Sequence, residues 1–178
     1  YGDRDETTGG YTWGEDKVWS REEALANYPR PDQAAEELPA DALLAPVEEN
    51  LSQVLARVDA NPQVTFTFYL PPGSILFWDK IQRSGALEAT LTMQQQVMET
   101  LISRPNVRLF YFMDDLDLIT NLDNYGDHVH YAPEVCQELA RRLLEEEPMT
   151  AQEIAPRMAA FRAFLEDYPY DTLFAGES

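Results

Sequence analysis

Two histidines and a neighbouring carboxylate are the side chains of this sequence best suited to chemistry. His128 and His130 are its only histidines, and Asp127 stands three residues before His130. Imidazole titrates near neutral pH and serves as a proton carrier in many enzymes. A carboxylate that accepts one ring N–H fixes the tautomer, so the other ring nitrogen can act as a base. The spacing therefore predicts that Asp127 orients His130, which would supply two members of a Ser-His-Asp triad.

The sequence offers no complete nucleophile motif for this pair. Ser74 lies in a strand–turn–helix setting typical of a nucleophile elbow, but only Gly73 fits the motif, because Ile75 and Leu76 follow the serine. Ser74 also suits the N-cap of the next helix. The single cysteine, Cys136, excludes an intrachain disulfide, and its helical pattern favours a small buried apolar residue over a nucleophile.

A metal site is an alternative use of the same residues. In an extended loop His128 and His130 would point to the same side. With Asp127, or with Asp114, Asp115 and Asp117, they could ligate a metal such as zinc. The carboxylates between Asp114 and Asp117 could hold a hard cation through oxygen, although the glycine and spacing of a calcium loop are missing. Capping of a helix start is the other interpretation of this acidic cluster. No motif indicates a cofactor.

Composition limits the classes of partner. The 178 residues include 13 basic and 32 acidic side chains, which gives a net charge of −19. Nucleic-acid binding requires a basic face, so no nucleic-acid partner is expected. An acidic surface is repelled by anionic lipid headgroups, and no apolar run of about 18 residues is present. The first residue is not Met, which favours a processed form or a fragment.

Helices and strands alternate in the pattern of the chain. The β-rich segments 64–70 and 107–112 predict two strands, and the long helix between them makes a parallel βαβ unit. Capping boxes, first-turn prolines and apolar residues at helical spacing predict helices over 20–28, 46–61, 75–83, 86–104, 133–146 and from 150 onward, where Pro156 should kink the helix or delay its start.

The two segments that follow the strands should lie together. Residues 71–74 and 114–130 come directly after a strand, and functional groups of α/β sheets gather beyond the carboxyl ends of strands. We divide the chain into an irregular aromatic and acidic arm with a short helix (1–45), an α/β core with the Asp-x-x-His loop (46–148), and a C-terminal helix with an aromatic tail that packs back on the body (149–178).

Six blocks carry a family resemblance. They are Thr65–Pro72, Ser74–Trp78, Gly85–Ala89, Asn106–Phe112, Asp167–Phe174 and, most specifically, Thr120–Tyr131. From about residue 40 the chain resembles the C-terminal half of an SGNH/GDSL-type hydrolase, more closely a group of uncharacterised bacterial envelope proteins with that fold. The resemblance implies an α/β protein of three α/β/α layers with a parallel, flavodoxin-like sheet, of which only the C-terminal part is present.

The resemblance also implies an activity. It indicates a serine esterase or acyltransferase acting on acyl esters of the bacterial cell envelope, including carbohydrate-linked ones, with His130 as general base and Asp127 as its orienting acid. His128 is an interior position of the motif. The family's Gly-Asp-Ser block has no counterpart, because Gly2-Asp3 is followed by Arg4. The nucleophile is therefore expected upstream, and the chain as given is expected to be inactive. The resemblance also implies an extracytoplasmic protein with an N-terminal membrane anchor outside this sequence.

Two other functions stay open. One is a non-catalytic extracytoplasmic binding or scaffold domain with the same fold, and the other is a metal-dependent hydrolase that uses His128 and His130. Two strands alone leave one edge and part of a face of the sheet bare. We therefore expect a homo-oligomer, an upstream segment that completes the sheet, or coverage by the aromatic arm of residues 1–19.

Overall fold

Two parallel strands form the centre of the structure, a computed structural model that describes residues 17–34 and 36–175. Strand β1 (Phe66–Leu70) pairs with β2 (Val107–Tyr111) in a register that places Phe66 beside Val107 and Leu70 beside Tyr111. The predicted parallel βαβ unit is thus confirmed, and the chain is an α/β protein. Residues 1–16 of the predicted arm (1–45) lie outside the described residues, so coverage of the sheet by residues 1–19 is not tested.

Helices make up most of the remaining described chain. They are α1 (Arg21–Ala26), α2 (Leu44–Asp59), α3 (Ile75–Arg83), α4 (Leu87–Ile102), α5 (Leu116–Thr120), α6 (Pro133–Glu145) and α7 (Ala151–Asp167), with 3-10 turns η1 (Leu122–Asn124) and η2 (Tyr170–Phe174). Six of these seven helices match predicted ranges, and α5 matches the helix start that was one interpretation of the acidic cluster at Asp114–Asp117.

Local capping explains where two of these helices begin. Ser20 Oγ accepts the N–H of Glu23 at 3.1 Å and starts α1. At the start of α7, the backbone N–H of Thr150 donates to the Glu153 carboxylate at 2.7 Å in a capping box. The expectation that Pro156 delays the start of α7 is wrong, because the capping box begins the helix at Ala151 and Pro156 lies inside it.

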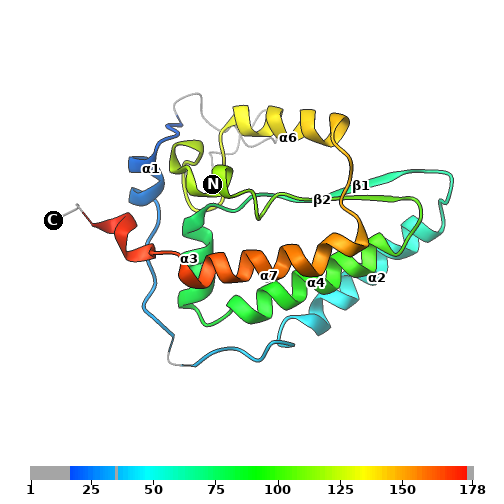
Figure 1. The fold of residues 1–178 in the computed structure, drawn as a ribbon, viewed down its shortest axis with the longest axis horizontal. Coiled ribbons are helices and arrows are strands. Elements are labelled where there is room, and N and C mark those ends of the chain that lie inside the picture. Colours follow the sequence, from blue (N-terminus) through cyan, green and yellow to red (C-terminus); the bar gives the residue numbers. More distant parts are fainter. Residues whose placement is uncertain (1–16, 35, 176–178) are drawn as a thin grey trace, which may run out of the picture.

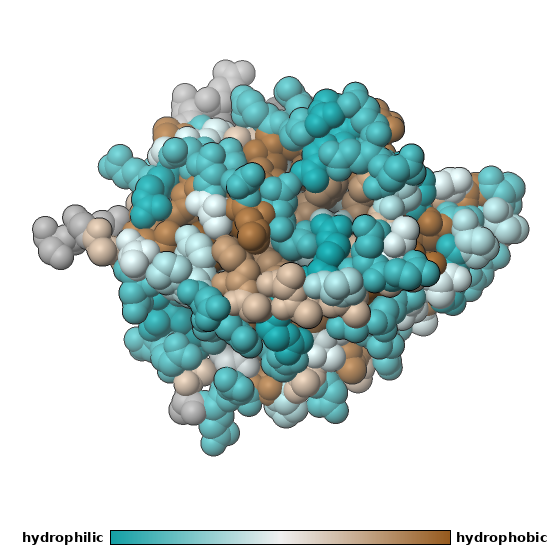
Figure 2. Space-filling model, in the orientation of Figure 1, coloured by the Kyte–Doolittle hydropathy of each residue, from teal (hydrophilic) through white to brown (hydrophobic). Residues whose placement is uncertain are grey.

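The strands lie between helices (Figure 1). Helix α6 covers one side of the pair, and α4 and α7 lie on the other side, with α2 beyond α4. Because alternate strand residues point to opposite faces, Leu109 and Tyr111 join the larger core while Phe110 and Phe112 pack with Val135 of α6. Figure 2 shows a largely hydrophilic surface on this face, with hydrophobic residues reaching the surface near its middle.

The aromatic tail packs back on the body, as predicted. Arg21 Nη2 donates to the Leu173 carbonyl at 2.8 Å, and the Arg30 guanidinium lies 4.3 Å from the centre of the Phe174 ring. Arg30 also forms two hydrogen bonds of 2.9 Å with the carboxylate of Asp79, which is 1% exposed. This buried ion pair joins the segment after α1 to helix α3. None of the described helices has the length and apolar character needed to cross a bilayer.

Candidate functional site

A closed loop of residues 125–131, here called the site loop, follows η1. Its ends are joined by an antiparallel bridge between Tyr125 and Tyr131, and the Gly126 N–H donates to the His130 carbonyl at 3.0 Å. The Tyr125 side chain is fully buried and anchors the loop in the core. The loop is therefore held at its base, while Asp127 and His130 lie in its outer part.

Asp127 is fixed by three hydrogen bonds. Its Oδ1 accepts the backbone N–H groups of Val129 at 2.8 Å and His130 at 2.7 Å. Its Oδ2 lies 2.6 Å from His130 Nδ1. Because a carboxylate can only accept, Nδ1 carries the proton and Nε2 is the nitrogen that can take up another. The structure thus brings Asp127 and His130 together in the geometry of an acid–histidine pair.

The electrostatics of the site loop favour an ionised Asp127. Burial raises the pKa of this carboxyl, but hydrogen bonds from the backbones of His130 and Val129 and from the His130 ring outweigh burial, so the net pKa lies below its usual value. Lys17 Nζ, 3.9 Å from Oδ2, adds a positive charge nearby. The carboxylate is therefore available to hold the His130 ring across the neutral pH range.

Glycine at position 126 allows the chain before α1 to lie against the site loop. A Cβ there would come within 2.8 Å of the Lys17 Cε and 3.2 Å of the Trp19 ring. Lys17 in turn lies 4.9 Å from the centre of the Trp19 ring. A side chain at residue 126 would require the end of Lys17 to move and would press on Trp19, which forms one wall of the neighbouring pocket.

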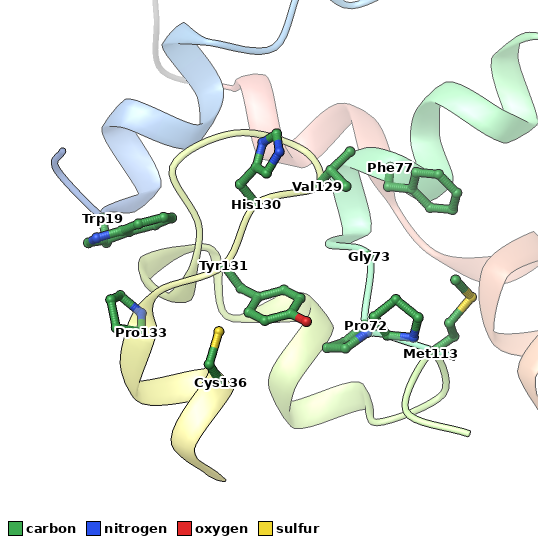
Figure 3. Close-up of a pocket in the computed structure, with 11 residues that line it drawn as sticks. Trp19, Pro72, Gly73, Phe77, Met113, Val129, His130, Tyr131, Pro133 and Cys136 are labelled. Carbon is green, nitrogen blue, oxygen red and sulfur yellow. The ribbon is translucent and has the colours of Figure 1, made fainter. Parts of the chain in front are cut away.

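An apolar pocket of about 560 Å³ opens beside His130. Its walls come from the turn after β1, the first turn of α3, Met113 two residues after β2, the site loop, the start of α6 and the segment before α1 (Figure 3). The lining residues are Trp19, Pro71, Pro72, Gly73, Phe77, Met113, Val129, His130, Tyr131, Pro133 and Cys136. Burial raises the pKa of Tyr131 to about 12, so its phenol is neutral at physiological pH. None of these side chains is acidic, although the chain as a whole carries −19.

His128 has surroundings different from those of His130. Its ring packs on Tyr28 with centroids 5.6 Å apart, and its Nε2 lies 3.3 Å from Lys80 Nζ. Burial and the Lys80 charge lower the pKa of His128, and its buried Nδ1 has no hydrogen-bond partner among the described residues. The neutral ring is therefore the stable form at neutral pH.

A metal site is not formed by these histidines in the described structure. His130 Nδ1 is bonded to Asp127, whereas His128 contacts Tyr28 and Lys80. Within residues 17–34 and 36–175, no three His, Cys, Asp or Glu side chains are grouped to hold a metal ion.

Ser74 joins the turn after β1 to the site loop. The N-cap role is only partly correct, because Ser74 precedes α3 but its hydroxyl makes no capping bond. Instead, Oγ donates to the His128 carbonyl at 2.8 Å, and the Ser74 N–H donates to the same oxygen at 3.3 Å. The two segments that follow the strands are thus in contact, as predicted, and the Ser74 hydroxyl is committed to the backbone.

Cys136 is exposed and lines the pocket, so the expectation of a small buried residue is wrong. It lies on the outer face of α6, whose inner face carries Val135.

The carboxylates of the acidic cluster have partners within the protein. Asp115 caps α5 by accepting the Leu118 N–H at 3.2 Å, and Asp114 pairs with Arg157 at 2.8 Å. Helix capping and ion pairing, rather than cation binding, account for these two carboxylates.

The sequence does not reveal the pocket itself. None of Phe77, Met113 and Tyr131 is a predicted site residue. Their signal in the sequence is weak: Met113 follows β2 by two residues, and Phe77 lies in the first turn of α3 after the β1 turn. Comparison of the chain with protein-family models, curated proteins and solved structures finds no match.

Proposed function

We propose that this chain carries the general-base part of a serine esterase or acyltransferase, with His130 as the base and Asp127 as its orienting acid. The observation that carries the proposal is the 2.6 Å contact between His130 Nδ1 and an Asp127 carboxylate that two backbone N–H groups hold in place. A pinned acid and a single ring tautomer at the mouth of an apolar pocket are the conditions that a triad base requires.

The proposed chemistry is acyl transfer through a covalent intermediate. A serine hydroxyl attacks the ester carbonyl while His130 Nε2 takes its proton, and the imidazolium then returns that proton to the leaving alcohol. The acyl-enzyme passes its acyl group to water or to another hydroxyl. Asp127 stays ionised and stabilises the imidazolium, which its lowered pKa supports.

The nucleophile is proposed to lie outside the described residues. Within residues 17–34 and 36–175, no serine hydroxyl forms a hydrogen bond with His130, and Ser74 donates to the His128 carbonyl instead. By the resemblance to SGNH/GDSL-type hydrolases, the substrate is an acyl ester of the bacterial cell envelope, and the setting is extracytoplasmic, with a membrane anchor outside this sequence. By the same resemblance, β1 and β2 belong to a fold of three α/β/α layers.

The apolar pocket supports the acyl part of this proposal. Its wall residues, such as Phe77, Met113 and Val129, present an apolar surface to an acyl chain and offer it no charged group. An ester that places its acyl group among these residues would bring its carbonyl to the rim, where His130 lies.

Turnover of p-nitrophenyl esters of increasing acyl length tests the proposal, using the natural polypeptide that contains this sequence. We expect His130→Ala to abolish turnover and His128→Gln, the matched change at the neighbouring histidine, to retain it. Turnover that is unchanged in His130→Ala would overturn the proposal.

A non-catalytic binding domain is the second candidate. The observation in its favour is the apolar pocket of about 560 Å³, whose lining among the described residues includes no serine or threonine. Such a domain would bind an apolar ester or its acid without consuming it. Saturable binding of a fluorescent fatty acyl probe, with no turnover in the natural polypeptide, would favour this function.

A further inference from the structure

The outer edge of β1 has no paired strand among residues 17–34 and 36–175. The Phe66 N–H donates to Asn106 at 2.8 Å and the Leu70 carbonyl accepts from Phe112 at 3.1 Å, so these β1 residues face β2. Because backbone groups alternate along a strand, those of Thr67 and Tyr69 point to the other edge. No backbone hydrogen bond from another part of the described chain reaches that edge.

The outer edge of β2 differs, since side chains and the α6–α7 connection cover it. The Met149 N–H donates to the Leu109 carbonyl at 2.8 Å, and Arg157 Nη2 donates to the Tyr111 carbonyl at 2.9 Å. A new strand would have to displace both donors to pair there. Of the two edges, β1 is the one at which a strand can be added.

The β1 edge also lacks the charges that normally protect an exposed strand. No charged residue occurs between Ala60 and Trp78, although the chain has 45 charged side chains, 13 basic and 32 acidic. Val64 is 43% exposed and Tyr69 is 44% exposed. Edge strands of monomeric proteins usually carry a lysine, an inward charge or a bulge that prevents pairing.

We propose that the β1 edge pairs with β1 of a second copy of this chain, in antiparallel orientation about a two-fold axis. An isologous contact requires a self-complementary surface, and β1 provides one. With Thr67 opposite Thr67 of the second copy, Phe66 lies opposite Phe68 and Thr65 opposite Tyr69. Aromatic and threonine cross-strand pairs of this kind are favourable, and no like charges meet. Pro71 ends the pairing segment.

This pairing joins the two small sheets into one. Thr67 and Tyr69 supply the unpaired N–H and C=O groups of each copy, and the side-chain faces of the two sheets continue across the axis.

The net charge of −19 on each copy opposes the approach of the two molecules. Salt screens that long-range repulsion and leaves the uncharged strand contact intact, so association should strengthen as salt concentration rises.

Sedimentation equilibrium of the 178-residue chain at low and high salt tests the proposal. We expect a mass of twice 20.3 kDa that is more populated at high salt. Thr67→Pro removes an outward N–H and leaves the hydrogen bonds to β2, and Thr67→Lys places two like charges opposite each other. Each should weaken the dimer roughly tenfold or more. Gln96→Lys, the same charge at an exposed site on α4, should leave the dimer intact.

Amide hydrogen exchange provides the second readout. In the dimer the Thr67 and Tyr69 amides should be protected, and in folded Thr67→Lys they should exchange freely while the Phe68 and Phe110 amides stay protected. A chain that is monomeric at high salt, or a dimer that persists in both Thr67 variants, would overturn the proposal. So would a longer natural polypeptide that is monomeric with Thr67 protected, because one of its own strands would then occupy the edge.

Discussion

Replacing Asp127 with Asn should reverse the tautomer of His130. The amide oxygen of Asn can still accept the Val129 and His130 backbone N–H groups, so the site loop keeps its shape. Its NH₂ group then faces Nδ1 at the position where the carboxylate oxygen lies 2.6 Å away. A donor opposite Nδ1 requires Nδ1 to accept, which moves the proton to Nε2 and removes the base.

The size of the effect differs between activity and stability. For a triad base in the wrong tautomer, a loss of about four orders of magnitude in kcat is expected. A charge-assisted hydrogen bond contributes about 1.5–3 kcal/mol when buried. The His130 side chain is 43% exposed, so solvent screening reduces the expected loss of stability to about 1 kcal/mol.

Nitrogen-15 NMR of the imidazole rings measures the tautomer directly, and the two histidines of the chain make the spectrum simple to assign. We expect the Nδ1–H form of His130 in the native chain and the Nε2–H form in Asp127→Asn, with the His128 signals unchanged. Asp117→Asn, the same loss of charge at an exposed residue of α5, is the control. An unchanged His130 tautomer in Asp127→Asn would refute the reasoning.

Three further predictions concern the surroundings of the site. Arg30→Met should lower the free energy of unfolding by about 3–5 kcal/mol, because it removes the guanidinium that neutralises the buried Asp79 carboxylate and leaves it the neutral Tyr28 hydroxyl. Adding Asp79→Asn should recover part of the loss in a urea titration. Lys80→Gln should raise the pKa of His128 in an NMR titration. The pKa of His128 in the folded chain lies below the unfolded value of about 6.5, so its contribution to the free energy of unfolding is complete above that pH and is lost as pH falls. Lys80→Gln should reduce this loss. An unchanged His128 pKa in the variant would contradict the prediction. Ser74→Ala should lower the free energy of unfolding by about 1 kcal/mol, because the hydrogen bond to the His128 carbonyl is lost. Labelling of the natural polypeptide by a serine-reactive fluorophosphonate probe should be retained, because the proposed nucleophile is another serine.

Local sequence signals predicted the fold well where neighbouring residues decide it. The capping box at Thr150 fixed the start of α7 more strongly than Pro156 opposed it. The β-rich segments gave both strands, and a helix between them gave their parallel order. The contact of Ser74 with the site loop followed from the rule that segments after parallel strands share an edge.

What the sequence could not show depends on contacts across long separations. Cys136 has an apolar neighbour in Val135, yet it lies on the exposed side of α6, because the helix phase is set by packing on Phe110 and Phe112. The pocket wall at Trp19 depends on Gly126, more than a hundred residues away in the chain. Hydrophobic periodicity marks which residues are apolar, but not which of them enclose a space.

The most direct measurement of the central claim is labelling of the natural polypeptide with a fluorophosphonate probe, followed by mass spectrometry to locate the modified serine. The pairing of Asp127 with His130 predicts one labelled serine, with labelling lost in His130→Ala, strongly reduced in Asp127→Asn and retained in His128→Gln. Absence of labelling, or labelling that does not depend on His130, would contradict the assignment of His130 as the base.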